Sequence, residues 1–269
     1  MISPASSPDR TWPPEAQRYP PVFPPAGASA WGDDPQGLWI DVDFGGVVQR
    51  FRWIEPGEFL MGSLEEETGR DSDEGPQHLV RLTEGFWLAD TACAQGLWQA
   101  LMGNNPSRFK DDEQNPVENV HWDDVQKFLK RVETQLPGIK AELPSEAEWE
   151  YACRAGSLTA YNFGKDINPE QANYGSHTVP VRRFKANAWG LYQMHGNVWE
   201  WCADGQRTYD ALTQTNPRGP EGEEALRVVR GGSWGSGPHR LRSAYRSPGR
   251  RGRRYADLGF RFSLRSTRP

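Results

Sequence analysis

The chain has 269 residues, of which 28 are glycine and 22 are proline, so about one residue in five favours turns. This composition excludes a helical bundle, and no apolar run approaches the roughly 18 residues of a membrane-spanning helix. The net charge is −5, but the segment from Arg227 to Arg261 holds ten arginines and one acid. We therefore expect a loop-rich protein with an acidic body and a basic C-terminal segment.

Residues 1–30 contain eight prolines and almost no aliphatic periodicity. This pattern predicts an extended arm whose side chains are mostly unpacked. We interpret the arm as a linker or a strap along the domain surface, with a proline-recognising partner as the alternative. The remainder is expected to form one domain over residues 31–265, followed by a short tail over residues 266–269.

The three cysteines, Cys93, Cys153 and Cys202, are widely separated and form no CxxC pair. An odd number without close spacing argues against a disulfide framework and favours buried free thiols in a reducing compartment. The first residues show no basic stretch followed by an apolar one, as a secretory signal would. We therefore expect a cytoplasmic protein without a membrane partner.

From residue 37 the sequence changes to short apolar runs bounded by turn residues. These runs predict strands at residues 47–54, 58–62, 78–82 and 86–89. The first predicted helix begins at Thr91 and ends at Gly103, and the second spans residues 122–136 with a stripe of period 3.6. A third helix is indicated by Ser145 and Glu148, which form a capping-box pattern, and ends at Gly156. No long helix is expected beyond Gly156.

Segments distributed along the chain match, in order, the hallmark motifs of the formylglycine-generating enzyme family, also called the sulfatase-modifying factor family. They are residues 59–63 (FLMGS), 73–78 (DEGPQH), 115–117 (NPV), 143–152 (LPSEAEWEYA), 190–201 (GLYQMHGNVWEW), 230–234 (RGGSW) and 258–261 (LGFR). The resemblance covers about residues 50–262. It implies an α+β fold of the C-type-lectin-like type, with two to three helices, small antiparallel sheets and much irregular structure.

Family members that oxidise a substrate cysteine bind copper through two cysteines after the Gly-Gly-Ser-aromatic motif. By position these cysteines fall on Ser236 and Leu241 here, and neither side chain supplies the soft thiolate that Cu(I) prefers. We therefore expect no copper. Iron-dependent sulfoxide synthases are other relatives, but their His-x3-His-x-Glu pattern has no counterpart among the scattered histidines. An enzyme using another metal or cofactor is the alternative.

Ser233 and Trp199 match family positions near the active-site pocket. Without the metal thiolates, the simpler interpretation is a hydrogen-bonding turn for Ser233 and a core position for Trp199. His195 lies in the same motif and invites a catalytic role, but the sequence places no acid or nucleophile beside it. We expect no catalytic residue among these three.

A structural calcium site is the better metal candidate. The resemblance implies a hard-cation site formed by a side-chain amide, two backbone carbonyls and a carboxylate, at Gln193, Gly196, Val198 and Glu200. Ligands that are all oxygen suit calcium. Gln193 stands where asparagine is commoner, so its amide reaches one methylene further.

Residues 235–257 lie between two family-like anchors and include positions outside the family framework. The segment is similar to the diversified region of the variable proteins of diversity-generating retroelements, in which adenine-directed mutagenesis changes surface codons on this scaffold. Asparagine codons have the form AAY, where Y is a pyrimidine. Replacement of either adenine in such a codon cannot produce Lys, Glu, Gln, Met or Trp. These five types fill about one position in five of the chain, yet none occurs in residues 235–257.

The preferred interpretation is therefore a ligand-binding protein without catalytic activity. Its binding face would take a protein or an anionic ligand, since arginine, tyrosine, serine and glycine are typical of selected binding loops. The predicted face comprises Gly235, Ser236, Gly237, His239, Arg240, Tyr245, Ser247, Gly249, Arg250, Arg251, Gly252, Arg253, Tyr255, Ala256 and Asp257. A solvated arginine-rich loop without a partner is one alternative. A nucleic-acid groove is disfavoured, because the body is acidic and no stacking platform is evident.

Overall fold

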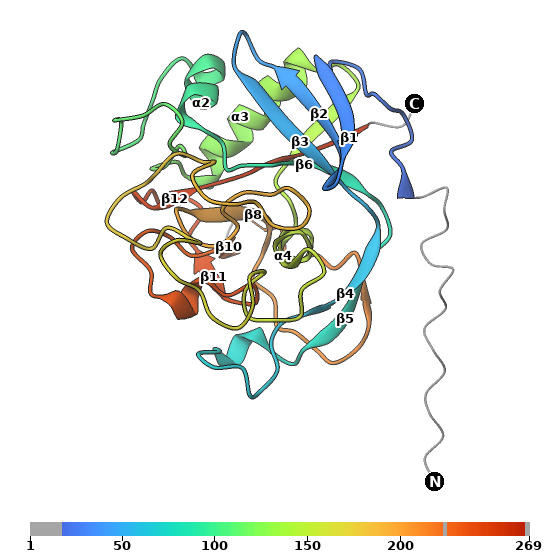
Figure 1. Ribbon diagram of the computed structural model, residues 1–269, viewed down its shortest axis with the longest axis vertical. Coiled ribbons are helices and arrows are strands. Elements are labelled where there is room, and N and C mark those ends of the chain that lie inside the picture. The colour runs from blue at the N-terminus through green and yellow to red at the C-terminus, as the bar shows by residue number, and fades with distance from the viewer. Residues whose placement is uncertain (1–17, 223–224, 267–269) are drawn as a thin grey trace.

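The computed structural model describes residues 18–222 and 225–266, and the strands in these residues form three sheets (Figure 1). The largest sheet has the strand order β1-β2-β3-β6-β13-β7, which places the last strand between two strands from the middle of the chain. Its members are β1 (Ala30–Asp34), β2 (Gly37–Asp43), β3 (Val48–Ile54), β6 (Phe86–Ala89), β13 (Ser263–Ser266) and β7 (Ile139–Glu142).

Two smaller sheets complete the strand arrangement. One has the order β11-β10-β8-β12, with β11 (Arg246–Gly249), β10 (Arg227–Arg230), β8 (Trp199–Gly205) and β12 (Leu258–Gly259). The other is the hairpin β4 (Gly57–Met61) and β5 (His78–Leu82), extended in parallel by β9 (Gln214–Thr215). Most pairings are antiparallel, so the predicted α+β class with small sheets is confirmed.

The three predicted helices are present as α2 (Gln95–Met102), α3 (Trp122–Gln135) and α4 (Glu146–Arg154). The capping box is confirmed, because Ser145 accepts from the Glu148 N–H while the Glu148 carboxylate accepts from the Ser145 N–H. The described residues beyond Gly156 contain one further helical turn, the 3-10 helix η2 (Pro238–Leu241), and another, η1 (Ser72–Glu74), precedes α2. No described helix combines the length and the hydrophobicity that a bilayer crossing requires.

The prediction that the first helix begins at Thr91 is wrong by one turn. The N–H of Cys93 donates to the Phe260 carbonyl (2.8 Å), and the Cys93 carbonyl accepts from Val117 (2.8 Å). These long-range bonds use the main-chain groups of Cys93, and the next residue, Ala94, is extended, so the helix begins only at Gln95. Its C-terminal end at Gly103 was predicted correctly, because glycine adopts the left-handed φ of 77° found there.

The hairpin of β1 and β2 was not predicted. Strand β1 is largely exposed, and Trp31 retains 56% of its accessible surface, so β1 lacks the alternation that indicates a half-buried strand. On the other side of β2, Arg50 forms a bidentate pair with Asp41 (2.7 and 2.8 Å) across the β2–β3 register.

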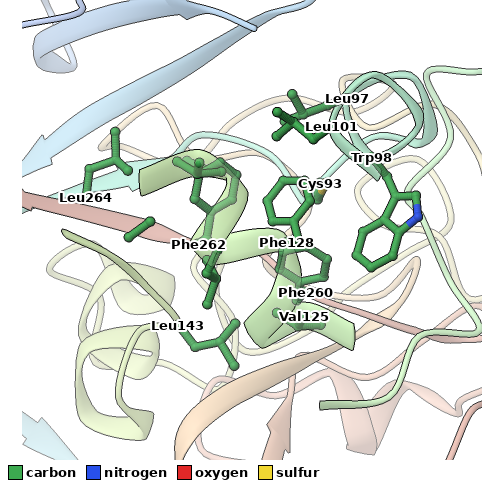
Figure 2. Packing of buried hydrophobic residues seen from close by; sticks show 14 of the residues in the cluster. Cys93, Leu97, Trp98, Leu101, Val125, Phe128, Leu143, Phe260, Phe262 and Leu264 are labelled. Atoms are coloured by element: carbon green, nitrogen blue, oxygen red, sulfur yellow. The ribbon is translucent and has the colours of Figure 1, made fainter. Parts of the chain in front are cut away.

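Two large hydrophobic clusters lie on opposite faces of the sheets. Alternation along β6 directs Trp87 and Ala89 into the first cluster and Phe86 and Leu88 into the second. In the first, the rings of Trp98 and Phe128 stack at 5.4 Å (Figure 2).

Phe260 and Phe262 pack edge-on against Phe128, at 5.2 and 5.3 Å (Figure 2). The chain that follows the predicted binding segment is thus fixed in the core, beneath α3.

The described part of the N-terminal arm, residues 18–30, packs on the large sheet. Phe23 lies edge-on to Trp31 (5.2 Å) and stacks on Trp87 (6.0 Å). The Trp53 indole N–H donates to the Arg18 carbonyl (2.6 Å). This part of the arm therefore follows the domain surface. The other residues predicted for the arm, 1–17, and residues 267–269 of the predicted tail lie outside the described residues.

Candidate binding site in the C-terminal loops

The two family-like anchors of the predicted binding segment meet in space. The Ser233 hydroxyl donates to Asp257 Oδ2 (2.8 Å), and the Trp234 indole N–H donates to the Ala256 carbonyl (3.1 Å). The Ser236 hydroxyl accepts from the Ser233 N–H (3.1 Å). The beginning and the end of residues 235–257 are therefore joined at their base.

The main chain of the loop that follows β11 is attached to the start of α3 and to the residues just before it. The Arg251 carbonyl accepts from the Trp122 N–H (3.1 Å), and the Tyr255 carbonyl accepts from the Asn119 N–H (2.9 Å). Within the loop, the Arg253 N–H donates to the Arg250 carbonyl (2.9 Å). Backbone groups thus fix the course of the loop, whatever side chains it carries.

Most of the predicted face is accessible, but three of its residues are not. Ser236, Tyr245 and Gly249 are buried, so their inclusion in an exposed face was wrong. The other members are exposed or partly exposed: Gly235, Gly237, His239, Arg240, Ser247, Arg250, Arg251, Gly252, Arg253, Tyr255, Ala256 and Asp257.

The three buried residues have structural contacts. The Tyr245 ring lies 5.8 Å from that of Trp199, and its carbonyl accepts from Arg230. Gly249 lies so close to Trp201 that an added Cβ would stand 2.4 Å from the indole ring. Residue 249 therefore has to be glycine, although the sequence shows it among apparently free positions.

Most arginines of the basic segment are paired with acids from distant parts of the chain. The buried pairs join Arg230 to Glu150, Arg242 to Glu74 (2.5 Å), Arg246 to Glu146 (2.7 Å) and Arg261 to Glu200 (2.7 Å). On the surface, Arg251 pairs with Asp123 (2.5 Å) and Arg254 with Asp124 (2.6 Å). These pairs reduce the local basic field that was expected from the sequence. The expectation missed them because the acids lie far from the arginines along the chain.

Among the described residues, Arg240, Arg250 and Arg253 are exposed and form no ion pair. Tyr255 follows these arginines in the sequence and retains 50% of its accessible surface. These four side chains therefore belong to the exposed part of the predicted face, and the three arginines among them have no ionic partner in the described residues.

Buried charges of the scaffold hold the segment from behind. Arg242 donates to both oxygens of Glu74 and to the carbonyls of Gly69 (2.6 Å) and His239 (2.9 Å). Burial opposes the ionisation of Glu150, yet the adjacent Arg154 and Arg230 lower the pKa of its carboxyl group. Each of these cations has an anionic partner, as a buried charge requires.

The positions of the family's copper cysteines have no metal-binding character. Leu241 is fully buried against Tyr161 and Ala172, and Ser236 is occupied by its hydrogen bond from Ser233. The three cysteines of the chain are buried at other places. Ser236 and Leu241 therefore do not provide the thiolate donors that a soft metal such as Cu(I) prefers.

The structure places a nucleophile beside His195, which the sequence did not indicate. Cys153 Sγ lies 3.7 Å from His195 Nε2 and 3.8 Å from the Ser243 hydroxyl. His195 Nδ1 donates to the Leu241 carbonyl (2.6 Å), while Nε2 accepts from the Asn162 N–H (3.1 Å). Both ring nitrogens are thus in use, and the imidazole is neutral.

Burial favours the neutral form of both groups in this cysteine–histidine contact. Burial lowers the pKa of His195 to about 4 and raises the pKa of Cys153 to about 12. Cys153 is therefore a thiol at neutral pH, whereas a catalytic cysteine needs a thiolate. The ring of His195 instead connects the loop of residue 162 to the end of η2.

Two of the four predicted calcium ligands, Gln193 and Glu200, are already engaged through their side chains. The Gln193 amide donates to the Pro180 carbonyl (2.8 Å), and its oxygen accepts from Asn197. Both oxygens of Glu200 accept from Arg261, and one also accepts from the Trp149 indole (2.7 Å). This arrangement does not fit a calcium ion, because the Glu200 carboxylate is already paired with the positively charged guanidinium of Arg261. Calcium binding through Gln193, Gly196, Val198 and Glu200 stays a prediction that needs these side chains to rearrange.

Comparison with known proteins gives a consistent family match. The sulfatase-modifying factor enzyme 1-like domain matches residues 47–265. Serine/threonine-protein kinase pkn1 of Chlamydia caviae is 33% identical over 258 residues, which cover 84% of this chain and 38% of that protein. The formylglycine-generating enzyme of Thermomonospora curvata is 35% identical over 160 residues, covering 51% of this chain and 50% of the enzyme. The chain thus spans half or less of the length of these curated relatives.

Among solved structures, Treponema denticola variable protein 1 superposes with a TM-score of 0.76. It is 26% identical, and the match covers 84% of this chain and 99% of that protein. The two proteins therefore share their overall fold.

Proposed function

The chain belongs to the sulfatase-modifying factor enzyme 1-like family, and from this premise we propose that it is a ligand-binding protein without catalytic activity. The observation that carries the proposal is the loop of residues 250–256. Its backbone is fixed on α3, while Arg250, Arg253 and Tyr255 extend from it without partners among the described residues. Such a loop presents side chains to a partner at low conformational cost.

The exposed side chains indicate which kind of partner the face would bind. Arginine offers a planar set of donors to carboxylates and phosphates, and tyrosine adds a rigid amphipathic ring. Arg240, at the end of η2, adds a third free guanidinium. We infer an acidic protein surface as the ligand, with Arg240, Arg250, Arg253 and Tyr255 as the contact residues.

The same features support a diversified origin of the segment. The structural likeness to a variable protein and the residue types of positions 235–257 agree with a retroelement-diversified receptor. The neighbouring DNA tests this part of the proposal. A reverse-transcriptase gene with a near-identical template repeat is expected there, and the absence of both would remove the claim of diversification.

The binding claim is tested with poly-L-glutamate as the acidic polypeptide. The double variant Arg250→Ser/Arg253→Ser should weaken its binding about tenfold or more in a low-salt titration, because each lost charged contact removes a substantial part of the affinity. The matched control is Arg131→Ser, which removes an exposed arginine from α3. Equal losses in both variants would show binding by overall charge and contradict the assigned face.

The alternative is an oxidase-type enzyme, which the identity to formylglycine-generating enzymes favours. Oxygen consumption with a thiol-containing peptide, in the presence of added copper or iron, distinguishes the two. We expect no turnover, because Ser236 and Leu241 replace the family's thiolates. Turnover that depends on the added metal would overturn the non-catalytic proposal.

A further inference from the structure

A cavity lies away from the C-terminal loops, where four separate segments converge. It has a volume of about 560 Å³. Gln36 comes from the β1–β2 turn, Arg52 from β3, Phe163 from the loop after α4, and Lys185 and Tyr192 from the loop before β8. No residue of the predicted binding face lines it.

The lining of this cavity has one sign of charge. Its charged residues are Arg52 and Lys185, and among the described residues no carboxylate lines it. The whole chain carries a net charge of −5, so a wall with only cations departs from the average surface. Lys185 is exposed and forms no ion pair with a described residue. A cavity of this kind attracts anions.

Arg52 is a buried cation with an incompletely used guanidinium. Only 6% of its surface is exposed, and Nη1 donates to Asp34 (2.7 Å) and to the Gly37 carbonyl (3.3 Å). Its Nε has no hydrogen-bond partner among the described residues. A buried donor without a partner is costly, so an acceptor beside Nε would be favourable.

Glycine at position 190 packs closely against that guanidinium. Gly190 has a φ of 75°, and an added Cβ would stand 2.5 Å from Arg52 Nε and 3.1 Å from Nη2. These two nitrogens form the edge that binds a carboxylate or phosphate in a bidentate manner. Any larger side chain at position 190 would therefore displace this edge of Arg52 from the wall of the cavity.

The remaining walls suit an organic molecule better than a bare ion. Phe163 and Tyr192 provide ring surface, and the Arg182 guanidinium lies over the Tyr192 ring at 5.0 Å. Asn162 also lines the cavity, and its Oδ1 accepts no hydrogen bond from the described residues. A hydroxyl or amino group of a bound molecule can donate to this oxygen.

We propose that this cavity binds a small organic anion, with its carboxylate or phosphate held by Arg52 and Lys185 and its remainder against Phe163 and Tyr192. The site is separate from the C-terminal face and does not depend on the function proposed for that face. Carboxylates and phosphates share the chemistry that the site recognises, so the experiment has to separate them.

Isothermal titration of the full chain with citrate and, separately, with inorganic phosphate tests the site. We expect saturable binding of at least one anion in low-salt buffer, and no binding of glycerol, which carries no charge. Lys185→Gln should weaken the binding about tenfold, as the loss of one charged hydrogen bond does. Lys127→Gln, which removes an exposed lysine of α3, should change it less than about twofold.

A further variant links the binding to the buried arginine. Gly190→Ala should abolish binding by displacing Arg52, provided that its circular dichroism matches that of the wild type; if it does not fold, Lys185→Gln alone decides. The absence of saturable binding of either anion up to about 10 mM would overturn the proposal, because a dissociation constant above that concentration is too weak to indicate a specific site. Equal losses in Lys185→Gln and Lys127→Gln, or loss in Arg250→Ser/Arg253→Ser instead, would also overturn it.

Discussion

Gly249 and Gly252 are three residues apart in the same basic segment, but their surroundings are opposite. A Cβ at Gly249 would meet the indole of Trp201 at 2.4 Å and Val229 at 3.1 Å. A Cβ at Gly252 would meet no atom within 4 Å. Glycine is thus required by packing at the first position and not at the second.

The two glycines form a matched pair for mutation. Gly249→Ser should lower the free energy of unfolding by about 3 kcal/mol, because the core cannot accept the extra atoms without moving Trp201. Gly252→Ser should change it by less than about 0.5 kcal/mol, as is usual at open surface positions. Urea denaturation measures both. A similar destabilisation in the two variants would contradict the packing described for residue 249.

Such differences between single residues could not be predicted from the sequence. Gly249 and Gly252 lie in the same arginine- and glycine-rich stretch, and only the distant Trp201 distinguishes them. The contact between Cys153 and His195 was missed for the same reason, since 42 residues separate them. The exposure of Arg253 was predicted correctly, because its sequence neighbours offer it no acidic partner and no core pattern includes it.

Elements defined by local signals were predicted well. The helix α4 begins where Ser145 and Glu148 cap it, and α3 follows its 3.6-residue stripe from Trp122. Elements that depend on remote pairing were predicted less well. The hairpin β1–β2 has little buried surface of its own, and the start of α2 is set by the bonds of Cys93 to Phe260 and Val117.

The N-terminal segment shows how a stretch without periodicity still contributes to stability. Phe23 packs between Trp31 and Trp87, whereas its neighbour Val22 is 57% exposed. Phe23→Ala should therefore lower the free energy of unfolding by about 2 kcal/mol, somewhat less than for a fully buried phenylalanine. Val22→Ala should have an effect near zero. Thermal unfolding followed by circular dichroism compares them, and equal effects would show that the packing of residue 23 contributes nothing.

At the scale of the whole molecule, the charges are organised across the chain. A sum over neighbouring residues assigns a strong positive field to the C-terminal segment. In the fold, acids from the loop after β4, from α3, from α4 and from β8 neutralise most of it. Composition could therefore predict the presence of free arginines, but only the fold identifies Arg240, Arg250 and Arg253.

These pairings and the sheets should make unfolding cooperative. Strands β6, β8 and β10 each contribute residues to both hydrophobic clusters, so neither cluster can lose its packing alone. We expect one transition in urea, with coincident midpoints for tryptophan fluorescence and far-UV circular dichroism. Midpoints that differ between the two probes would show that the clusters unfold separately.

The main-chain attachment of the C-terminal loop has a consequence for its length. The carbonyls of Arg251 and Tyr255 are four residues apart, and they meet the N–H groups of Trp122 and Asn119, which are three residues apart. Any amino acid provides a carbonyl, so composition is unrestricted at these points. An inserted or deleted residue between them would shift one acceptor away from its donor. The loop can thus vary in what it displays, whereas its residue count is set by the spacing of Asn119 and Trp122, where the chain enters α3.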